Sequence, residues 1–131
     1  GLLAEQTKNK TKTLLILDDN GDDFKRVAQS VVNKLVSNSR HLDLSIIFLS
    51  QKITQSPTIL RGNADVIIAF SASSFLEREC LWKEISTVSK KDFQRIFNEA
   101  TENSDHGFLC SSIGRDGSLR FYGKDFTTEL K

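Results

Sequence analysis

Two adjacent carboxylates, Asp18 and Asp19, are the residues of this sequence best suited to chemistry. They follow the unbroken apolar run Leu-Leu-Ile-Leu at residues 14–17, which predicts a strand covered on both faces, as in a parallel sheet. Ligands of open parallel sheets collect at the carboxyl ends of the strands. There, one carboxylate can hold Mg²⁺ through water and a second can orient or deprotonate an attacking water. The pair therefore indicates phosphoryl transfer, although two acids can also simply open a turn into Asn20.

A glutamine is expected at the same edge of the sheet. The second apolar run, residues 44–49, predicts another buried strand, and Ser50 and Gln51 follow it directly. A carboxamide at this place can hydrogen-bond the attacking water or the γ-phosphate of a nucleotide. The alternative for Gln51 is a surface or capping residue, and only its expected place beside the acids favours a role in a site. Ser50 lacks the Gly-x-Ser-x-Gly setting of a serine hydrolase.

Two arginines are candidates for contacts with phosphate. Arg40 precedes the second strand, so it should lie at the opposite edge of the sheet from Asp18, within reach of a neighbouring molecule's site. An arginine given in trans stabilises charge on a transferring phosphoryl group. Arg61 ends a short predicted helix near the strand ends and is placed to face phosphate or DNA. The alternatives are a solvated Arg40 beside His41, and an Arg61 that relieves a helix C-terminal dipole.

The natural partner of these acids, a phosphate-binding Gly-x-x-x-x-Gly-Lys-Ser/Thr loop, occurs nowhere in the 131 residues. We therefore expect the hydrolytic half of a nucleotide site without its binding half. The chain has no methionine and begins with Gly1, and we expect it to be a piece of a longer protein.

Apolar periodicity predicts an α/β fold, a parallel sheet with helical crossovers that ends in a C-terminal β-hairpin. We expect residues 1–12 to be a polar leader, 13–126 to be the domain and 127–131 to be a tail. Three parallel strands are expected at 13–18, 44–49 and 65–70, with helices over 24–35 and 58–61, the second closed by Gly62. Two further helices are expected to begin at the capping-box-like Ser74 and Ser89. A hairpin of strands 107–113 and 118–122 follows.

Composition excludes several classes of protein. With 131 residues and 38% hydrophobic content, the chain fits one globular domain. A net charge of +1 rules out a global basic field for nucleic acid. Cys80 and Cys110 are too few for a disulfide framework and lack zinc-ligand spacing, which fits a reducing compartment. No apolar window of about 18 residues predicts a membrane span.

Three further segments carry a resemblance. They read Arg-His-Leu-Asp-Leu-Ser-Ile-Ile-Phe-Leu-Ser-Gln at 40–51, Pro-Thr-Ile-Leu-Arg-Gly-Asn at 57–63 and Asp-Val-Ile-Ile-Ala-Phe at 65–70. In this order and spacing they resemble the FtsK/HerA superfamily of P-loop ATPases that pump DNA, above all the poxvirus-type genome-packaging ATPases of large DNA viruses and their virophage and transposon relatives. The likeness covers about residues 13–126 and includes the closing hairpin. The chain thus resembles the C-terminal part of the motor domain, from the Walker B strand onward.

The resemblance implies roles for individual residues. Asp18 is the Mg²⁺-associated acid, and Asp19 stands where many relatives carry the catalytic Glu, one methylene longer. Gln51 matches the glutamine that senses the γ-phosphate, and Arg40 matches a basic position proposed as the trans arginine finger. Asn63 matches an asparagine of the segment after the short helix and is taken as a further nucleotide contact.

The resemblance implies an ATP-driven translocase of double-stranded DNA, with ATP and Mg²⁺ as cofactors and a homo-oligomeric ring as the active form. Double-stranded DNA and capsid proteins are the implied partners, and the implied location is intracellular, in host cytoplasm, viral factory or virion. This piece alone should bind ATP poorly or not at all. The alternative is a non-enzymatic α/β interaction or assembly domain, such as a degenerate NTPase. A receiver-like phosphoacceptor fits less well, because no second acceptor Asp ends the next strand.

Overall fold

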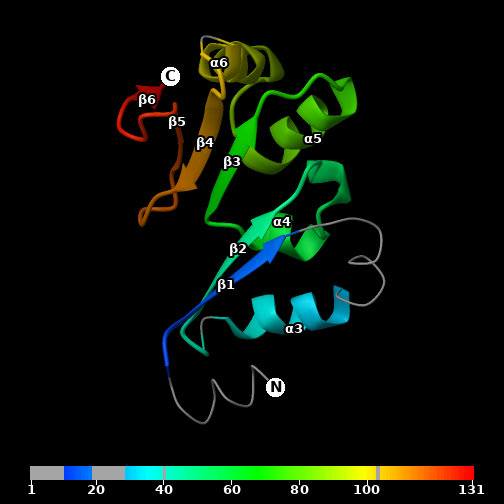
Figure 1. Ribbon diagram of the computed structural model, residues 1–131. Coiled ribbons are helices and arrows are strands. Elements are labelled where there is room, and N and C mark those ends of the chain that lie inside the picture. The colour runs from blue at the N-terminus through cyan, green and yellow to red at the C-terminus, as the bar shows by residue number, and fades with distance from the viewer. Residues whose placement is uncertain (1–10, 19–28, 40, 103) are drawn as a thin grey trace. The chain divides into compact units, whose positions relative to one another are not determined.

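The computed structural model describes residues 11–18, 29–39, 41–102 and 104–131. Contacts divide the chain into two compact units, Gly1–Asn63 and Ala64–Lys131 (Figure 1). Each unit has its own sheet, a parallel pair of strands in the first and four antiparallel strands in the second. Length and composition, which fit one globular domain, give no sign of this division.

A parallel strand pair with its helical connection forms the first unit. Strand β1 (Thr13–Asp18) pairs with β2 (Leu44–Leu49), from Thr13 opposite Leu44 to Asp18 opposite Leu49. Both strands have the predicted bounds. The described part of their connection holds α3 (Gln29–Asn38), whereas residues 24–28 of the predicted helix lie outside the described residues. After β2 come the 3₁₀ helix η1 (Ile53–Gln55) and α4 (Thr58–Asn63).

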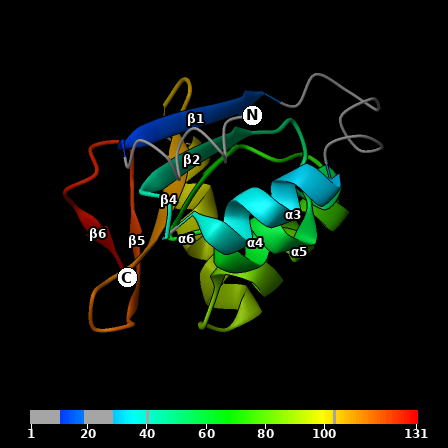
Figure 2. The same ribbon diagram turned by 90° about the horizontal axis from the view of Figure 1, so that it is seen from below.

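Helices α3 and α4 contact each other and lie on the same side of the β1–β2 sheet (Figure 2). Side chains alternate between the two faces of a strand, and burial alternates with them. One face is buried or half-buried, which is typical of a face covered by helices, and the other is exposed. The buried or half-buried set is Thr13, Leu15, Leu17, Leu44, Ile46 and Phe48, and the exposed set is Leu14, Ile16, Asp18, Ser45, Ile47 and Leu49.

The second unit is an antiparallel sheet with two helices. Its strands follow the order β3 (Val66–Phe70), β4 (Phe108–Ile113), β5 (Leu119–Tyr122) and β6 (Glu129–Leu130). Helices α5 (Phe75–Ile85) and α6 (Lys90–Glu102) connect β3 to β4.

An aromatic cluster joins α6 to this sheet. The rings of Phe93 and Phe97 stack at 5.8 Å, and Phe93 lies 6.3 Å from Phe121 on β5. These three side chains are at most 5% exposed, and Leu109 on β4 is fully buried. The apolar face of α6 therefore forms the core of the second unit together with the sheet.

The third predicted strand pairs differently from expectation. It begins one residue later, at Val66, and runs antiparallel to β4, so that Phe70 lies opposite Phe108. The described residues contain one hydrogen-bonded parallel pair, and β3 is bonded to β4 rather than to a parallel strand. Helices α5 and α6 return the chain so that β4 runs back along β3, and this pairing buries Ala69 opposite Leu109.

The two predicted capping boxes have different outcomes. At α6 the Ser89 hydroxyl accepts a hydrogen bond from the Asp92 backbone N–H at 3.1 Å and donates to the Asp92 carboxylate at 2.7 Å, so this cap is confirmed. Ser74 stands at the N-cap of α5, so the predicted helix start is confirmed, but its side chain makes no capping bond. Phe75 and Leu76 at the start of α5 are exposed, so water can satisfy N–H groups there.

The predicted closure of the short helix at Gly62 is also wrong. Helix α4 continues through Gly62 to Asn63. The Asn63 side-chain amide donates to the carbonyl of Ile59 at 2.8 Å, and this bond satisfies a C-terminal carbonyl that a glycine cap would otherwise serve.

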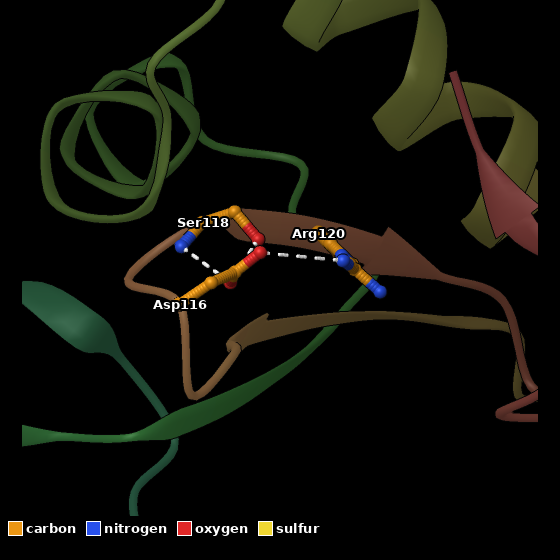
Figure 3. A network of polar contacts seen from close by, with 3 residues as sticks. All are labelled: Asp116, Ser118 and Arg120. Atoms are coloured by element: carbon orange, nitrogen blue, oxygen red, sulfur yellow. Dashed lines mark hydrogen bonds and ion pairs between the residues drawn. The ribbon is translucent and has the colours of Figure 1, made fainter.

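The C-terminal hairpin has the predicted turn, and Asp116 holds it (Figure 3). The Asp116 carboxylate accepts hydrogen bonds from the Ser118 backbone N–H at 3.0 Å and hydroxyl at 2.6 Å, and it lies 3.6 Å from the Arg120 guanidinium. These contacts, the Ser118 hydroxyl first, lower the pKa of Asp116. Gly117 has a φ of +79°, a conformation that favours glycine. Strand β6 pairs with β5 inside the segment expected to be a tail.

Asp125 provides a test of the segment that leads into β6. Its carboxylate accepts bonds from the Thr128 hydroxyl at 2.6 Å and from the backbone N–H groups of Thr127 and Thr128 at 3.1 Å, which lower its pKa from 3.8 to about 2. Because this pKa is depressed, its contribution to stability is present above pH 3.8 and is lost as pH falls through about 2.

We expect NMR titration to give Asp125 a pKa of about 2. Thr128→Val should raise that pKa more than Thr127→Val, since the Thr128 hydroxyl is the largest cause of the shift. A wild-type midpoint near pH 4, or equal effects of the two variants, would contradict this contact.

Candidate active site

The carboxyl edge of the β1–β2 sheet brings two of the predicted site residues together. Asp18 ends β1 opposite Leu49, and Gln51 follows β2 two residues later. Paired strands lie about 4.8 Å apart, and two residues of extended chain span about 7 Å. Both side chains are exposed. The parallel register therefore puts the ends of both strands, with the predicted acid and carboxamide, at one edge of the sheet.

The Asp18 carboxylate is open to a cation. It is exposed, and no described residue forms an ion pair with it. Mg²⁺ binds proteins through one or two carboxylates, with waters and substrate phosphates as its other ligands. A single exposed carboxylate at the edge of a parallel sheet fits that donor set.

Ser50 determines the course of the chain directly after β2. Its hydroxyl donates to the Lys52 carbonyl at 2.9 Å and accepts from the Lys52 backbone N–H at 3.3 Å. A serine that bonds to the backbone two residues on makes a local turn. The turn places Gln51 in an exposed bend directly after the strand, and the Ser50 hydroxyl is used for structure rather than as a nucleophile.

Arg61 and Asn63 lie on α4 and bond within it. The Arg61 guanidinium donates to the Thr58 hydroxyl at 3.2 Å, and the Asn63 amide nitrogen donates to the Ile59 carbonyl at 2.8 Å. Asn63 is exposed, and its amide oxygen has no partner among the described residues. That oxygen is the atom through which Asn63 can contact a ligand without unwinding the helix end.

Asp19 and Arg40 lie outside the described residues. The strand that Arg40 precedes does begin at the opposite edge from Asp18, as predicted. An open hollow of about 530 Å³, which the sequence did not suggest, lies at this amino edge. Its lining residues are Lys12, Thr13, Leu14, Ser39, Asp43, Leu44 and Ser45.

Other chemistry finds little support within the described residues. They contain no group of three or more His, Cys, Asp and Glu side chains that could hold a metal ion. Cys110 is buried, and burial raises the pKa of its thiol, so it is not an activated nucleophile. None of their helices is long and apolar enough to cross a membrane.

Comparison of this sequence with known proteins identifies a family that it matches. A family model described as Poxvirus A32 protein matches residues 2–108, well over half of the chain. The chain belongs to the poxvirus A32 protein family. A search of curated proteins finds no match. The family match includes β1, β2 and α4, and therefore every residue predicted for the site.

Solved structures of viral packaging enzymes share the fold of this A32 family member. The genome packaging NTPase B204 of Sulfolobus turreted icosahedral virus 2 matches as its ATPγS complex, with a TM-score of 0.61 and 18% identity over 88% of this chain and 54% of that one. Its AMPPCP complex gives 0.62 and 18% over 91% and 56%. The DNA-packaging ATPase B204 of Sulfolobus turreted icosahedral virus gives 0.62 and 17% over 92% and 58%. The chain thus has the predicted α/β fold and spans little more than half the length of these structures.

Replacement of Asn63 tests its place at the end of α4. In Asn63→Asp the carboxylate cannot donate to the Ile59 carbonyl, and it adds negative charge at the negative end of a helix dipole. We expect α4 to lose about 1 kcal/mol of local stability, which is about fivefold faster amide exchange by NMR. Gln51→Glu is the matched control and should leave exchange in α4 unchanged. Equal exchange in the two variants would contradict the contact.

Proposed function

We propose that this chain is the acid-bearing, C-terminal part of an ATP-driven genome-packaging ATPase that moves double-stranded DNA. The observation that carries the proposal is the parallel pairing of β1 with β2, which sets Asp18 and Gln51 at one edge in a chain of the poxvirus A32 family. Packaging NTPases with the same fold bind ATPγS and AMPPCP. ATP and Mg²⁺ are accordingly the cofactors that we assign.

Asp18 and Asp19 have different roles in this proposal. When bound, Mg²⁺ neutralises charge on the phosphates of ATP. Asp18 holds this ion through water, because its carboxylate is exposed at the strand end and no described residue forms an ion pair with it. Asp19, next in sequence, orients or deprotonates the attacking water. Its side chain is one methylene shorter than Glu, so the water must lie closer to the strand end.

Two amides assist from neighbouring segments. Gln51, in the bend after β2, hydrogen-bonds the attacking water or the γ-phosphate. Asn63 contacts the nucleotide through its amide oxygen, while its nitrogen remains bound to the Ile59 carbonyl. Asn63 thereby keeps its fold-forming contact in this role.

The arginines extend the proposal to an assembly. Arg40 precedes β2 and serves the site of a neighbouring subunit as a trans arginine finger, which requires a homo-oligomeric ring. Arg61 faces phosphate or DNA from α4. Capsid proteins are further partners, and the enzyme works inside the infected cell or in the virion.

A test of the acids uses the full-length ATPase that contains this chain. Asp18→Ala and Asp19→Ala should each lower DNA-stimulated ATP hydrolysis by roughly 100-fold or more. The first removes the carboxylate that holds Mg²⁺, and the second removes the carboxylate that orients the attacking water. Asp105→Asn, an exposed acid in the second unit, is the control and should retain wild-type activity. The measurement is the rate of phosphate release at saturating MgATP.

Retained hydrolysis in Asp18→Ala would contradict the assignment. A full-length protein without any phosphate loop, and without hydrolysis before mutation, would favour the alternative of a non-enzymatic α/β assembly domain. That alternative rests on one observation, the absence of the phosphate loop from these 131 residues.

A further inference from the structure

The segment between β2 and α4, residues 50–57, carries Gln51 and has no buried residue. Its 3₁₀ helix η1 likewise buries no side chain. A connecting segment without a buried apolar anchor depends on hydrogen bonds for a fixed conformation. The bonds made within this segment therefore decide how well the position of Gln51 is defined.

Three hydrogen bonds converge on the backbone carbonyl of Lys52. It accepts from the Ser50 hydroxyl at 2.9 Å, from the Gln55 backbone N–H at 3.1 Å and from the Ser56 hydroxyl at 3.3 Å. The Ser50 hydroxyl also accepts from the Lys52 backbone N–H at 3.3 Å. Ser50 and Lys52 are thus joined in both directions, and Gln51 is the residue between them. The backbone on both sides of Gln51 is held, while its side chain is exposed.

We propose that Ser50 is a positioning residue for Gln51 and that Ser56 assists it, an inference that rests on the proposed function. A group that orients an attacking water acts over a narrow range of positions, and a misplacement of about 1 Å can lower the rate on the order of 100-fold. An exposed carboxamide on an unrestrained bend would sample many positions. The Ser50 hydroxyl restricts that bend before the nucleotide binds, so less freedom is lost when the site is filled.

The second unit contains the same motif without a predicted site residue. The Ser86 hydroxyl donates to the Val88 carbonyl at 3.4 Å and accepts from the Val88 backbone N–H at 3.1 Å. Each serine follows a regular element, since Ser50 follows β2 and Ser86 is the C-cap residue of α5. The residue enclosed by the second motif is Thr87, which has no role in the proposed site. Ser86 is therefore a matched control for the loss of such a turn.

Steady-state hydrolysis by the full-length ATPase tests the proposal. Ser50→Ala should lower kcat about 10-fold and change the KM for MgATP by less than about twofold, because the phosphate loop supplies most nucleotide contacts. Ser50→Thr keeps the hydroxyl and should retain most of kcat. Ser56→Ala removes the longest of the three bonds to the Lys52 carbonyl and should lower kcat less than Ser50→Ala does. Ser86→Ala should keep the wild-type kcat and KM.

A double variant tests whether Ser50 acts through Gln51. Once Gln51→Ala has removed the carboxamide, Ser50→Ala should cause no further loss of kcat. An equal loss with and without the carboxamide would overturn the proposal, because the hydroxyl would then act on something other than Gln51. Wild-type kcat in Ser50→Ala would overturn it as well.

The outcomes separate this inference from the proposed function. Slow hydrolysis by Gln51→Ala together with wild-type kcat in Ser50→Ala would overturn the positioning role and leave the function standing. Wild-type hydrolysis by Gln51→Ala, or no hydrolysis by the full-length protein, would contradict the proposed function and the positioning role with it. Circular dichroism checks that the variants fold. If Ser50→Ala does not, Ser50→Thr and Ser50→Val, which have similar shapes and differ in the hydroxyl, decide the question, and equal kcat in these two would overturn the proposal.

Discussion

Parallel pairing of β1 with β2 is the interaction on which the candidate site depends. Because both strands run in the same direction, their carboxyl ends share one edge, and the register from Thr13–Leu44 to Asp18–Leu49 sets that edge to the residue. A slip of one residue would turn Asp18 toward α3 and α4 and bury its charge, at a large cost in free energy. Burial of Leu44 and of Leu35 on α3 therefore holds the acid in place.

The parts of the fold predictable from sequence are those set by local patterns. Two largely apolar runs indicated the bounds of β1 and β2, the Ser89–Asp92 pair indicated the start of α6, and two glycines indicated the hairpin turn. The partner of β3 was not predictable, because its apolar run looks the same in parallel and antiparallel pairings. Ser74 stands at the predicted start of α5 but makes no side-chain capping bond, and sequence spacing does not reveal whether such a bond forms.

The candidate site was predictable in its placement and less so in its chemistry. The strand ends placed Asp18 and Gln51 at one edge of the sheet. The roles of Arg61 and Asn63, and of Asp19 and Arg40, depend on a nucleotide and a neighbouring subunit. The last two residues lie outside the described residues. The bond of the Asn63 side chain to the Ile59 carbonyl lies within its own helix, and the resemblance that pointed to Asn63 gave no sign of it. Half of a nucleotide site is expected to show three features, and this chain has them: an exposed acid, an uncovered apolar sheet face and no phosphate loop.

Calorimetric titration with MgATP tests this central claim most directly. The 131-residue chain contains the acid edge and lacks the phosphate loop, which supplies most nucleotide contacts in P-loop enzymes. We predict no saturable binding to the isolated chain up to about 1 mM MgATP, and saturable binding to the full-length ATPase. Binding of MgATP to the isolated chain with the affinity of the full-length protein would contradict the account.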